Sequence, residues 1–149
     1  TMETFLAFNI PILIKLLLAI FLGGLIGVER TMANKMAGMR TYAFVSLGSC
    51  LFVIISVLTT SGFINITNFD PLRVASAIVM GIGFICGGAI IYHDNKLLGL
   101  TTAAGMWVAS GIGIAVGFGY FTLAVMTTVL TLFIFSTLWE VEEKFKKGE

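Results

Sequence analysis

Long runs of hydrophobic residues without charge, separated by short charged clusters, dominate the chain. The uncharged runs cover residues 16–28, 41–69, 74–93 and 97–139. A helix needs about 20 mostly apolar residues to cross the hydrocarbon core of a bilayer, and the last run is long enough for two crossings. The pattern therefore predicts an all-α protein, a polytopic transmembrane helix bundle of about five spans.

The charged clusters and turn residues set the limits of these predicted spans. The last long run is divided at "GFGYF" (Gly117–Phe121), where glycine and interfacial aromatic residues coincide. We predict one transmembrane domain over residues 1–139 and a cytoplasmic tail over residues 140–149. Its spans are expected at about 6–28, 42–60, 73–92, 100–117 and 120–139.

Lysine and arginine give the predicted orientation. With five spans, Arg30, Lys35, Arg40 and Lys96 share a side with the basic residues of the tail. Loops rich in Lys and Arg remain on the cytoplasmic side of bacterial membranes. We therefore expect the N-terminus outside and the C-terminus in the cytoplasm.

Composition agrees with a membrane protein and excludes several functions. Hydrophobic residues make up 58% of the chain, charged residues 11%, and the mean hydropathy is +1.02. The net charge of +1 gives no reason to expect a nucleic-acid partner. No candidate nucleophile lies beside a histidine base at a recognisable spacing, so we expect no enzyme activity and no cofactor.

Glycine and alanine recur at four-residue spacing in the first, third and fourth predicted spans. In lipid, helices associate through close backbone contact, which requires small residues where they cross. The alternative is that these glycines interrupt helices and expose carbonyl oxygens to an ion. On the packing interpretation, the three spans form the tight centre of the bundle, and the fifth span lies at the periphery, facing lipid or a second subunit. The glycine faces bind another helix, either of a second copy, most simply in a dimer, or of a partner subunit. The residues given this packing role are Gly23, Gly27, Gly81, Gly83, Gly87, Gly113 and Gly117.

Charged residues on the predicted outer side are the first group of candidate functional residues. "DPLR" predicts a helix start, with Asp70 as the N-cap and Pro71 at the first helical position. Lys15, in the first span, either reaches Asp70 or extends to the membrane interface. The sequence leaves open whether Lys15, Asp70 and Arg73 form a functional ion pair or serve as cap and anchor.

The second group lies on the predicted inner side. Glu29 and Arg30 follow the glycines of the first span, and Arg40 opens the second. A pair between Glu29 and Arg40 would join these two spans. The alternative is that Glu29 and Asp94 offer carboxylate oxygens to Mg²⁺ or Ca²⁺, which bind oxygen ligands. No further metal ligand is evident.

Four segments together resemble the membrane domain of the MgtC/SapB family. They are "GGLIGVER" (23–30), "AGMRTYAFVSLG" (37–48), "DPLRVASAIVMGIGFICGGAII" (70–91) and "GLTTAAGMWVASGIGIAVGFG" (99–119). Each motif is short, but the four occur in the right order over nearly the whole chain.

This resemblance implies a bacterial inner-membrane protein linked to magnesium homeostasis, virulence and growth under magnesium limitation. It also implies the rotary ATP synthase as a candidate membrane partner. The positions that match the family motifs include, besides the charged residues above, Gly38, Gly88, Gly99, Leu100 and the polar or aromatic residues Thr41, Thr101, Thr102 and Trp107.

The chain departs from the family pattern at three positions. Tyr42 stands where histidine is frequent, Ala77 where glutamine is frequent, and Cys86 where glycine is common. An imidazole role after Thr41 and a polar group in the third span are therefore not expected.

Two function hypotheses follow. The first is a non-enzymatic membrane regulator that binds another helix through its glycine faces. The second is a transporter or channel in which Glu29 and Asp70 contact a divalent cation. The small number of acidic residues at membrane depth favours the first, and the family name favours the second.

Overall fold

The computed structural model describes residues 2–62, 70–93 and 96–146. Its elements are almost all helical, which confirms the all-α class. In chain order they are α1 (Met2–Met32), α2 (Met39–Gly62), α3 (Pro71–Gly88), β1 (Ile91–His93), β2 (Lys96–Leu98), α4 (Leu100–Phe118), α5 (Phe121–Phe133), the π-helix η1 (Ile134–Leu138) and α6 (Trp139–Lys146).

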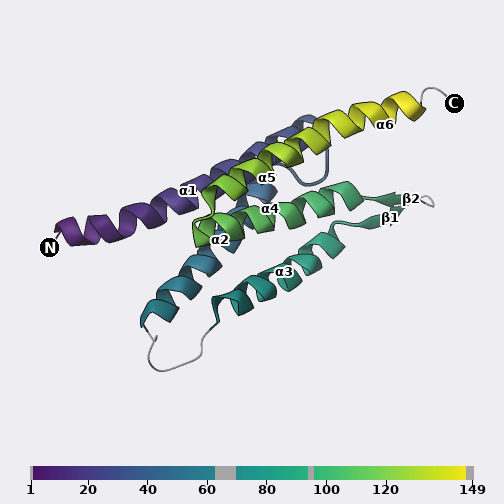
Figure 1. Cartoon of the computed structure of the whole chain (residues 1–149). Coiled ribbons are helices and arrows are strands. Elements are labelled where there is room, and N and C mark those ends of the chain that lie inside the picture. The colour runs from purple at the N-terminus through teal and green to yellow at the C-terminus, as the bar shows by residue number, and fades with distance from the viewer. Residues whose placement is uncertain (1, 63–69, 94–95, 147–149) are drawn as a thin grey trace.

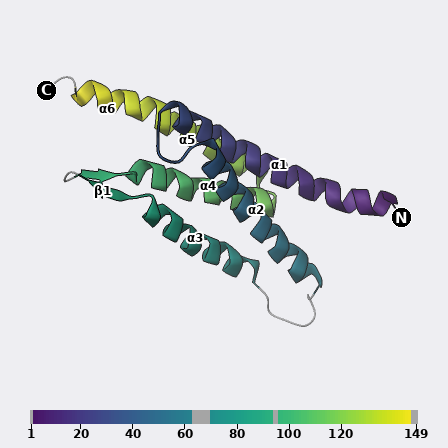
Figure 2. The same cartoon turned by 180° about the vertical axis from the view of Figure 1, so that it is seen from behind.

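The helices α1 to α5 run in alternating directions along one elongated body, and η1 and α6 continue the direction of α5 (Figures 1 and 2). The loop between α1 and α2, the β-hairpin and α6 lie at the end that carries the C-terminus, called here the Arg30 end. The N-terminus, the end of α2 and the turn between α4 and α5 lie at the opposite end.

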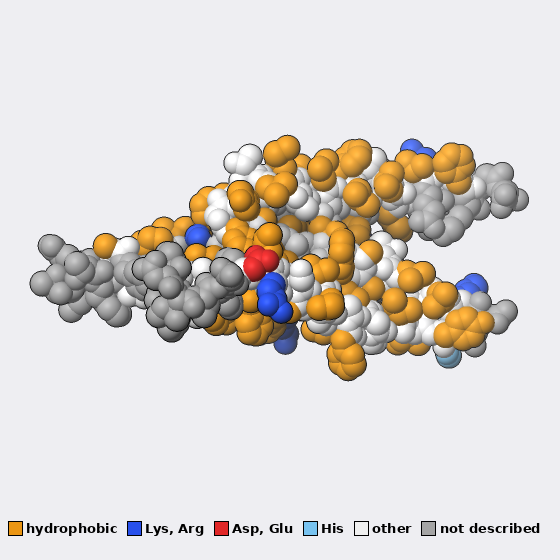
Figure 3. Space-filling view, turned by 60° about the horizontal axis from the view of Figure 1, so that its bottom comes forward, with side chains coloured by type: hydrophobic (Ala, Val, Ile, Leu, Met, Phe, Trp, Pro, Cys, Tyr) orange, Lys and Arg blue, Asp and Glu red, His pale blue; other side chains and the backbone are white. Residues whose placement is uncertain are grey.

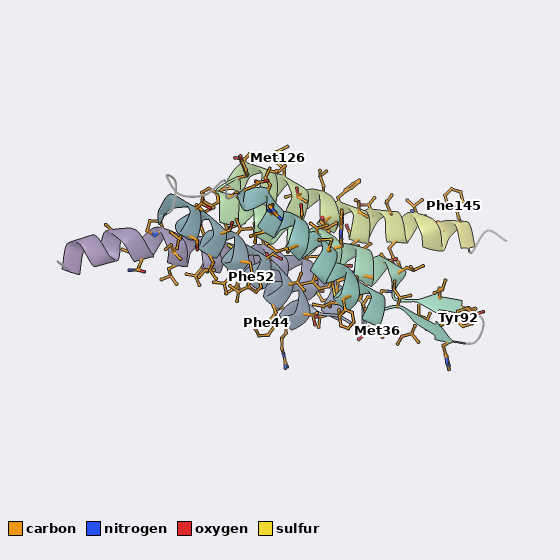
Figure 4. All side chains as sticks on the ribbon, turned by 90° about the horizontal axis from the view of Figure 1, so that it is seen from below. Met36, Phe44, Phe52, Tyr92, Met126 and Phe145 are labelled. Carbon is orange, nitrogen blue, oxygen red and sulfur yellow. The ribbon has the colours of Figure 1, made fainter. Side chains whose placement is uncertain are left out.

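Four helical segments of the described chain are long and apolar enough to cross a membrane: Asn9–Met32, Met39–Thr60, Leu100–Phe118 and Phe121–Leu138. The apolar part of α3, Leu72–Gly88, is shorter. Hydrophobic side chains also cover much of the outer surface (Figure 3). In Figure 4, Phe44 and Phe52 of α2 and Met126 of α5 project away from the bundle. This surface is suited to lipid rather than water.

The third predicted span is wrong at its C-terminal end. It was expected to continue to residue 92, but α3 ends at Gly88 and a two-stranded hairpin follows, in which Ile91 pairs with Leu98 and His93 with Lys96. Two consecutive glycines disfavour the last turn of the helix, while the β-branched and aromatic residues of "IIY" favour a strand. Residues 94–95, and with them Asp94, lie outside the described residues.

The centre of the bundle also differs from the prediction. The helix α2 lies between α1 and α4 and packs extensively on both, whereas α3 packs at the edge, on α4 and α2. A Cβ added at Gly23 would lie 2.6 Å from the carbonyl oxygen of Tyr42, and one added at Gly117 would lie 2.7 Å from Cβ of Val53. The packing glycines Gly23, Gly27, Gly113 and Gly117 therefore face α2 or the residue that opens it, not α3.

Small polar residues of α2 complete this contact. Ser46, Ser49 and Cys50 are buried, and Ser49 Oγ lies 2.9 Å from Ser110 Oγ of α4. Tyr42, also buried, donates its hydroxyl hydrogen to the carbonyl oxygen of Thr102 at 3.0 Å. These bonds join α2 to α4 within the apolar layer, where water cannot substitute for a lost partner.

Lys15 joins α1 to the far end of α4. Its Nζ donates to the carbonyl oxygen of Gly117 at 2.9 Å, in the last turn of α4, where carbonyl groups lack partners within the helix. The expected alternatives, a pair with Asp70 or an extension to the interface, are replaced by this helix-capping contact.

Candidate functional site at the Arg30 end

Arg30 is the most deeply buried charged residue of the described chain, with 3% of its surface exposed. It forms a two-point ion pair with Glu29: Nη2 donates to Oε1 at 2.7 Å, and Nε donates to Oε2. The Glu29 side chain is 25% exposed. A bidentate pair of this kind satisfies both carboxylate oxygens.

Phe135 supports this ion pair from a distant part of the sequence. The guanidinium carbon of Arg30 lies 3.7 Å from the centre of the Phe135 ring, a cation–π contact. Phe135 is buried and lies within the π-helix η1. A π-turn widens the helix locally and often occurs at functional sites. Here it places an aromatic ring over the arginine.

Two cavities meet at Arg30. One, of about 610 Å³, is lined by Glu29, Arg30 and Lys35 together with Phe135, Ser136 and Trp139; we call it the Glu29 cavity. The other, of about 660 Å³, is lined on its polar side by Arg30, Lys35, Gly99, Thr101 and Thr102; we call it the Thr102 cavity. Arg30, Lys35, Phe135 and Trp139 line both.

The start of α4 forms one wall of the Thr102 cavity. Gly99 has a φ of +88°, which L side chains rarely adopt, and it lies directly against the carbonyl oxygen of Ala89. No side chain of the described residues caps this helix start. The sharp turn after the hairpin therefore directs the first amides of α4 to the Arg30 end.

The predicted Glu29–Arg40 pair is wrong. Within the described residues the salt bridge joins Glu29 to Arg30, and Arg40 has an exposed side chain. The α1–α2 connection is held differently, because Thr31 Oγ1 accepts a hydrogen bond from the amide of Met39 at 3.0 Å. Gly38 packs against the same threonine.

Asp70 and Arg73 lie at the opposite end, away from this site. The predicted helix start is confirmed: Asp70 Oδ1 accepts a hydrogen bond from the amide of Leu72 at 2.9 Å, and Pro71 opens α3. Arg73 is exposed. The structure does not bring either residue near Glu29.

The remaining motif residues are divided between core and surface. Thr102 is buried in the wall of the Thr102 cavity. Thr101 and Trp107 are exposed, and Thr41 is partly buried. Cys86 is buried and its Sγ lies 3.2 Å from the carbonyl oxygen of Ala103.

Two groups at or near the Arg30 site were not identified from the sequence: the Phe135 ring, which covers Arg30, and the Tyr42 hydroxyl, which bonds to the Thr102 carbonyl. Phe135 lies in a π-helix, for which the sequence gives no recognisable signal. Tyr42 could have been found, because it lies inside the family motif of residues 37–48.

Three glycines of α3 differ from the packing glycines of α1 and α4. A Cβ added at Gly81, Gly83 or Gly87 would meet no atom within 4 Å, so no part of the described chain packs on them. Phe84, between them in sequence, is 88% exposed. Within one chain these three glycines are therefore not at a helix crossing.

Metal-ligand groups are scarce. Within the described residues no three side chains of His, Cys, Asp or Glu lie close enough together to hold a metal ion. The proposed partner of Glu29 in such a site, Asp94, is not among those residues.

The apolar surface, the spanning helices and the buried ion pair at one end define a polytopic helical membrane protein. The chain belongs to the MgtC family, whose model matches residues 16–144, and this confirms the resemblance found in the sequence motifs.

Several curated relatives are similar to most of the chain. The protein named "Putative magnesium transporter YhiD" of Escherichia coli K12 is 39% identical over 124 residues, which is 82% of this chain and 58% of that protein. "Protein MgtC" of Salmonella typhimurium LT2 is 39% identical over 122 residues, 82% of this chain and 50% of that protein. The chain spans about half the length of these relatives. No solved structure matches it.

Proposed function

We propose that this chain is a non-enzymatic membrane protein of magnesium homeostasis that acts by binding a second copy of itself through α3. The observation that carries the proposal is the open glycine face of that helix. Gly23 and Gly113 are covered by α2, whereas Gly81, Gly83 and Gly87 are covered by nothing in the described chain.

A second copy is the occupant that suits this face. Gly81, Gly83 and Gly87 form shallow positions beside two large exposed side chains, Met80 and Phe84. In a two-fold interface, each surface meets its own copy, so the large side chains of one helix can enter the glycine positions of the other. No charged residue lies between Val74 and Gly88, so the face belongs in lipid or against another helix.

A groove beside α3 extends this surface. It has a volume of about 530 Å³ and lies between α2 and α3, lined by Phe44, Gly48, Phe52, Gly81 and Ile85 among others. Because α2 contributes aromatic side chains here, a partner helix would contact both elements.

Replacing Gly83 with leucine is expected to lower the yield of cross-linked dimer several-fold, because the added side chain blocks close approach of the two helices. The measurement is cross-linking of the purified protein in detergent and in bilayers. Gly24→Leu is the matched control, since Gly24 is equally open but lies on α1. Equal dimer yields for the two variants would contradict the assignment of α3. Capture of another membrane protein, such as the rotary ATP synthase, in place of the dimer would also contradict it.

The location proposed with this function is the bacterial inner membrane, with the N-terminus outside. It is supported by the basic residues, since Lys35, Arg40, Lys96 and Lys144 belong to segments at the Arg30 end. Family membership and the names of the relatives support the connection to magnesium.

Transport of a divalent cation is the second candidate, favoured by the name of the Escherichia coli relative. Against it, both oxygens of Glu29 are already bound by Arg30. We expect vesicles containing the purified protein and a Mg²⁺ dye to show no more influx than empty vesicles. Influx that Glu29→Gln abolishes would establish transport and overturn the regulator proposal.

A further inference from the structure

The Thr102 cavity combines positive charge with apolar walls. Among the described residues that line it are two cationic side chains, Arg30 and Lys35, and no carboxylate. Glu29, which neutralises Arg30, lines the other cavity. The net positive charge of the Thr102 cavity therefore comes from Lys35, beside the apolar side chains of Leu97, Ile134 and Leu138.

Hydrogen-bond donors at this cavity are incompletely used. A guanidinium group carries five N–H donors, and Arg30 gives Glu29 hydrogen bonds from Nε and Nη2. Within the described part of the chain, Nη1 of Arg30 has no hydrogen-bond partner, and it is not among the fully enclosed atoms that lack one. This donor is therefore accessible to water or to a ligand.

The amides at the start of α4 add donors of the same kind. The first intrahelical bond is donated by Ala103 N to the Gly99 carbonyl at 2.8 Å, so the amides of Thr101 and Thr102 precede it. These residues line the same cavity as Arg30 and Lys35. Free amides and the helix dipole favour a negative group at this position.

We propose that the Thr102 cavity binds a phosphate-type anion, held by Arg30, Lys35 and the first amides of α4. This site is separate from the α3 surface and does not depend on the proposed function. A phosphate matches the bidentate donor geometry of an arginine. The anion can be the headgroup of an anionic phospholipid, with its chains along Ile134 and Leu138, or a free phosphate compound.

Trp139 supplies the measurement, because it lines the cavity. The chain has two tryptophans, so Trp107→Phe leaves Trp139 as the single tryptophan, whose emission can be excited selectively over that of the tyrosines. This protein would be titrated with inorganic pyrophosphate in phosphatidylcholine bilayers. In parallel, its emission would be compared in bilayers with and without phosphatidylglycerol. A saturable response to pyrophosphate identifies a free anion, and a response to phosphatidylglycerol alone identifies a lipid headgroup.

Lys35→Gln should lower the apparent affinity for the probe about tenfold, the effect of one lost charge-assisted hydrogen bond. Lys35→Arg should largely retain this affinity. Lys35 is exposed, so these variants are expected to fold. Lys144→Gln is the matched control, because Lys144 is exposed at the same end and does not line the cavity. No saturable response to either probe, or equal weakening by Lys35→Gln and Lys144→Gln, would overturn the proposal.

Discussion

Gly113→Ala should destabilise the bundle by about 3 kcal/mol, a large effect for the addition of one methyl group. The added Cβ would overlap the carbonyl oxygen of Ser46 and lie 2.9 Å from Cβ of Ser49. A helix backbone cannot rotate away as a side chain can, so α2 and α4 would have to separate. That separation would also strain the hydrogen bond between Ser49 and Ser110, which spans 2.9 Å.

Gly111→Ala is the matched control on the same helix. A Cβ at Gly111 would meet no atom within 4 Å, and alanine is the better helix former by about 1 kcal/mol. This variant should therefore be neutral or slightly more stable. Thermal unfolding of both purified variants in detergent measures the difference. Equal unfolding temperatures would show that α4 does not contact α2 at Gly113.

Arg30→Gln should have the second largest effect, again about 3 kcal/mol, because it removes one partner of a buried ion pair. Glu29 would keep its charge without its two donors, and the Phe135 ring would lose the cation above it. The double variant Glu29→Gln, Arg30→Gln should recover part of this loss, since no unpaired charge then remains. Chemical unfolding of the single and double variants tests both statements.

Arg40→Gln distinguishes this pair from the one predicted from the sequence. Because Arg40 is exposed, its replacement should change the free energy of unfolding by no more than about 0.5 kcal/mol. A loss as large as that of Arg30→Gln would instead support a Glu29–Arg40 pair. In that case the site described at the Arg30 end would be incorrect.

The features predicted correctly from the sequence are those that depend on local pattern. Uncharged apolar runs specify helices regardless of what the helices contact, and "DPLR" contains its own cap, with Asp70 bonded to the amide two residues later. The hairpin was missed because "IIYH" continues the apolar run of α3. Only the two preceding glycines signal the change.

The features predicted incorrectly depend on contacts between distant segments. A glycine stripe shows that a helix can be approached closely, but it does not identify the approaching helix. For Gly23 and Gly113 the partner is α2, whose facing residues are Ser46 and Ser49 rather than glycine. The ion pair was assigned to the wrong arginine because adjacent helical residues seldom face each other. Phe135, far along the sequence, holds Arg30 in the observed position.

The two charged anchors of α1 have a consequence for the surrounding bilayer. From Lys15, bonded to the last turn of α4, to Arg30, the helix rises about 22 Å, and α4 itself, with 19 residues, is about 28 Å long. Both lengths are less than the roughly 30 Å of an average hydrocarbon core. The apolar spans of α1 and α2 continue past these anchors and contain 24 and 22 residues, so these two helices must tilt, or extend into the interface, beside the shorter α4.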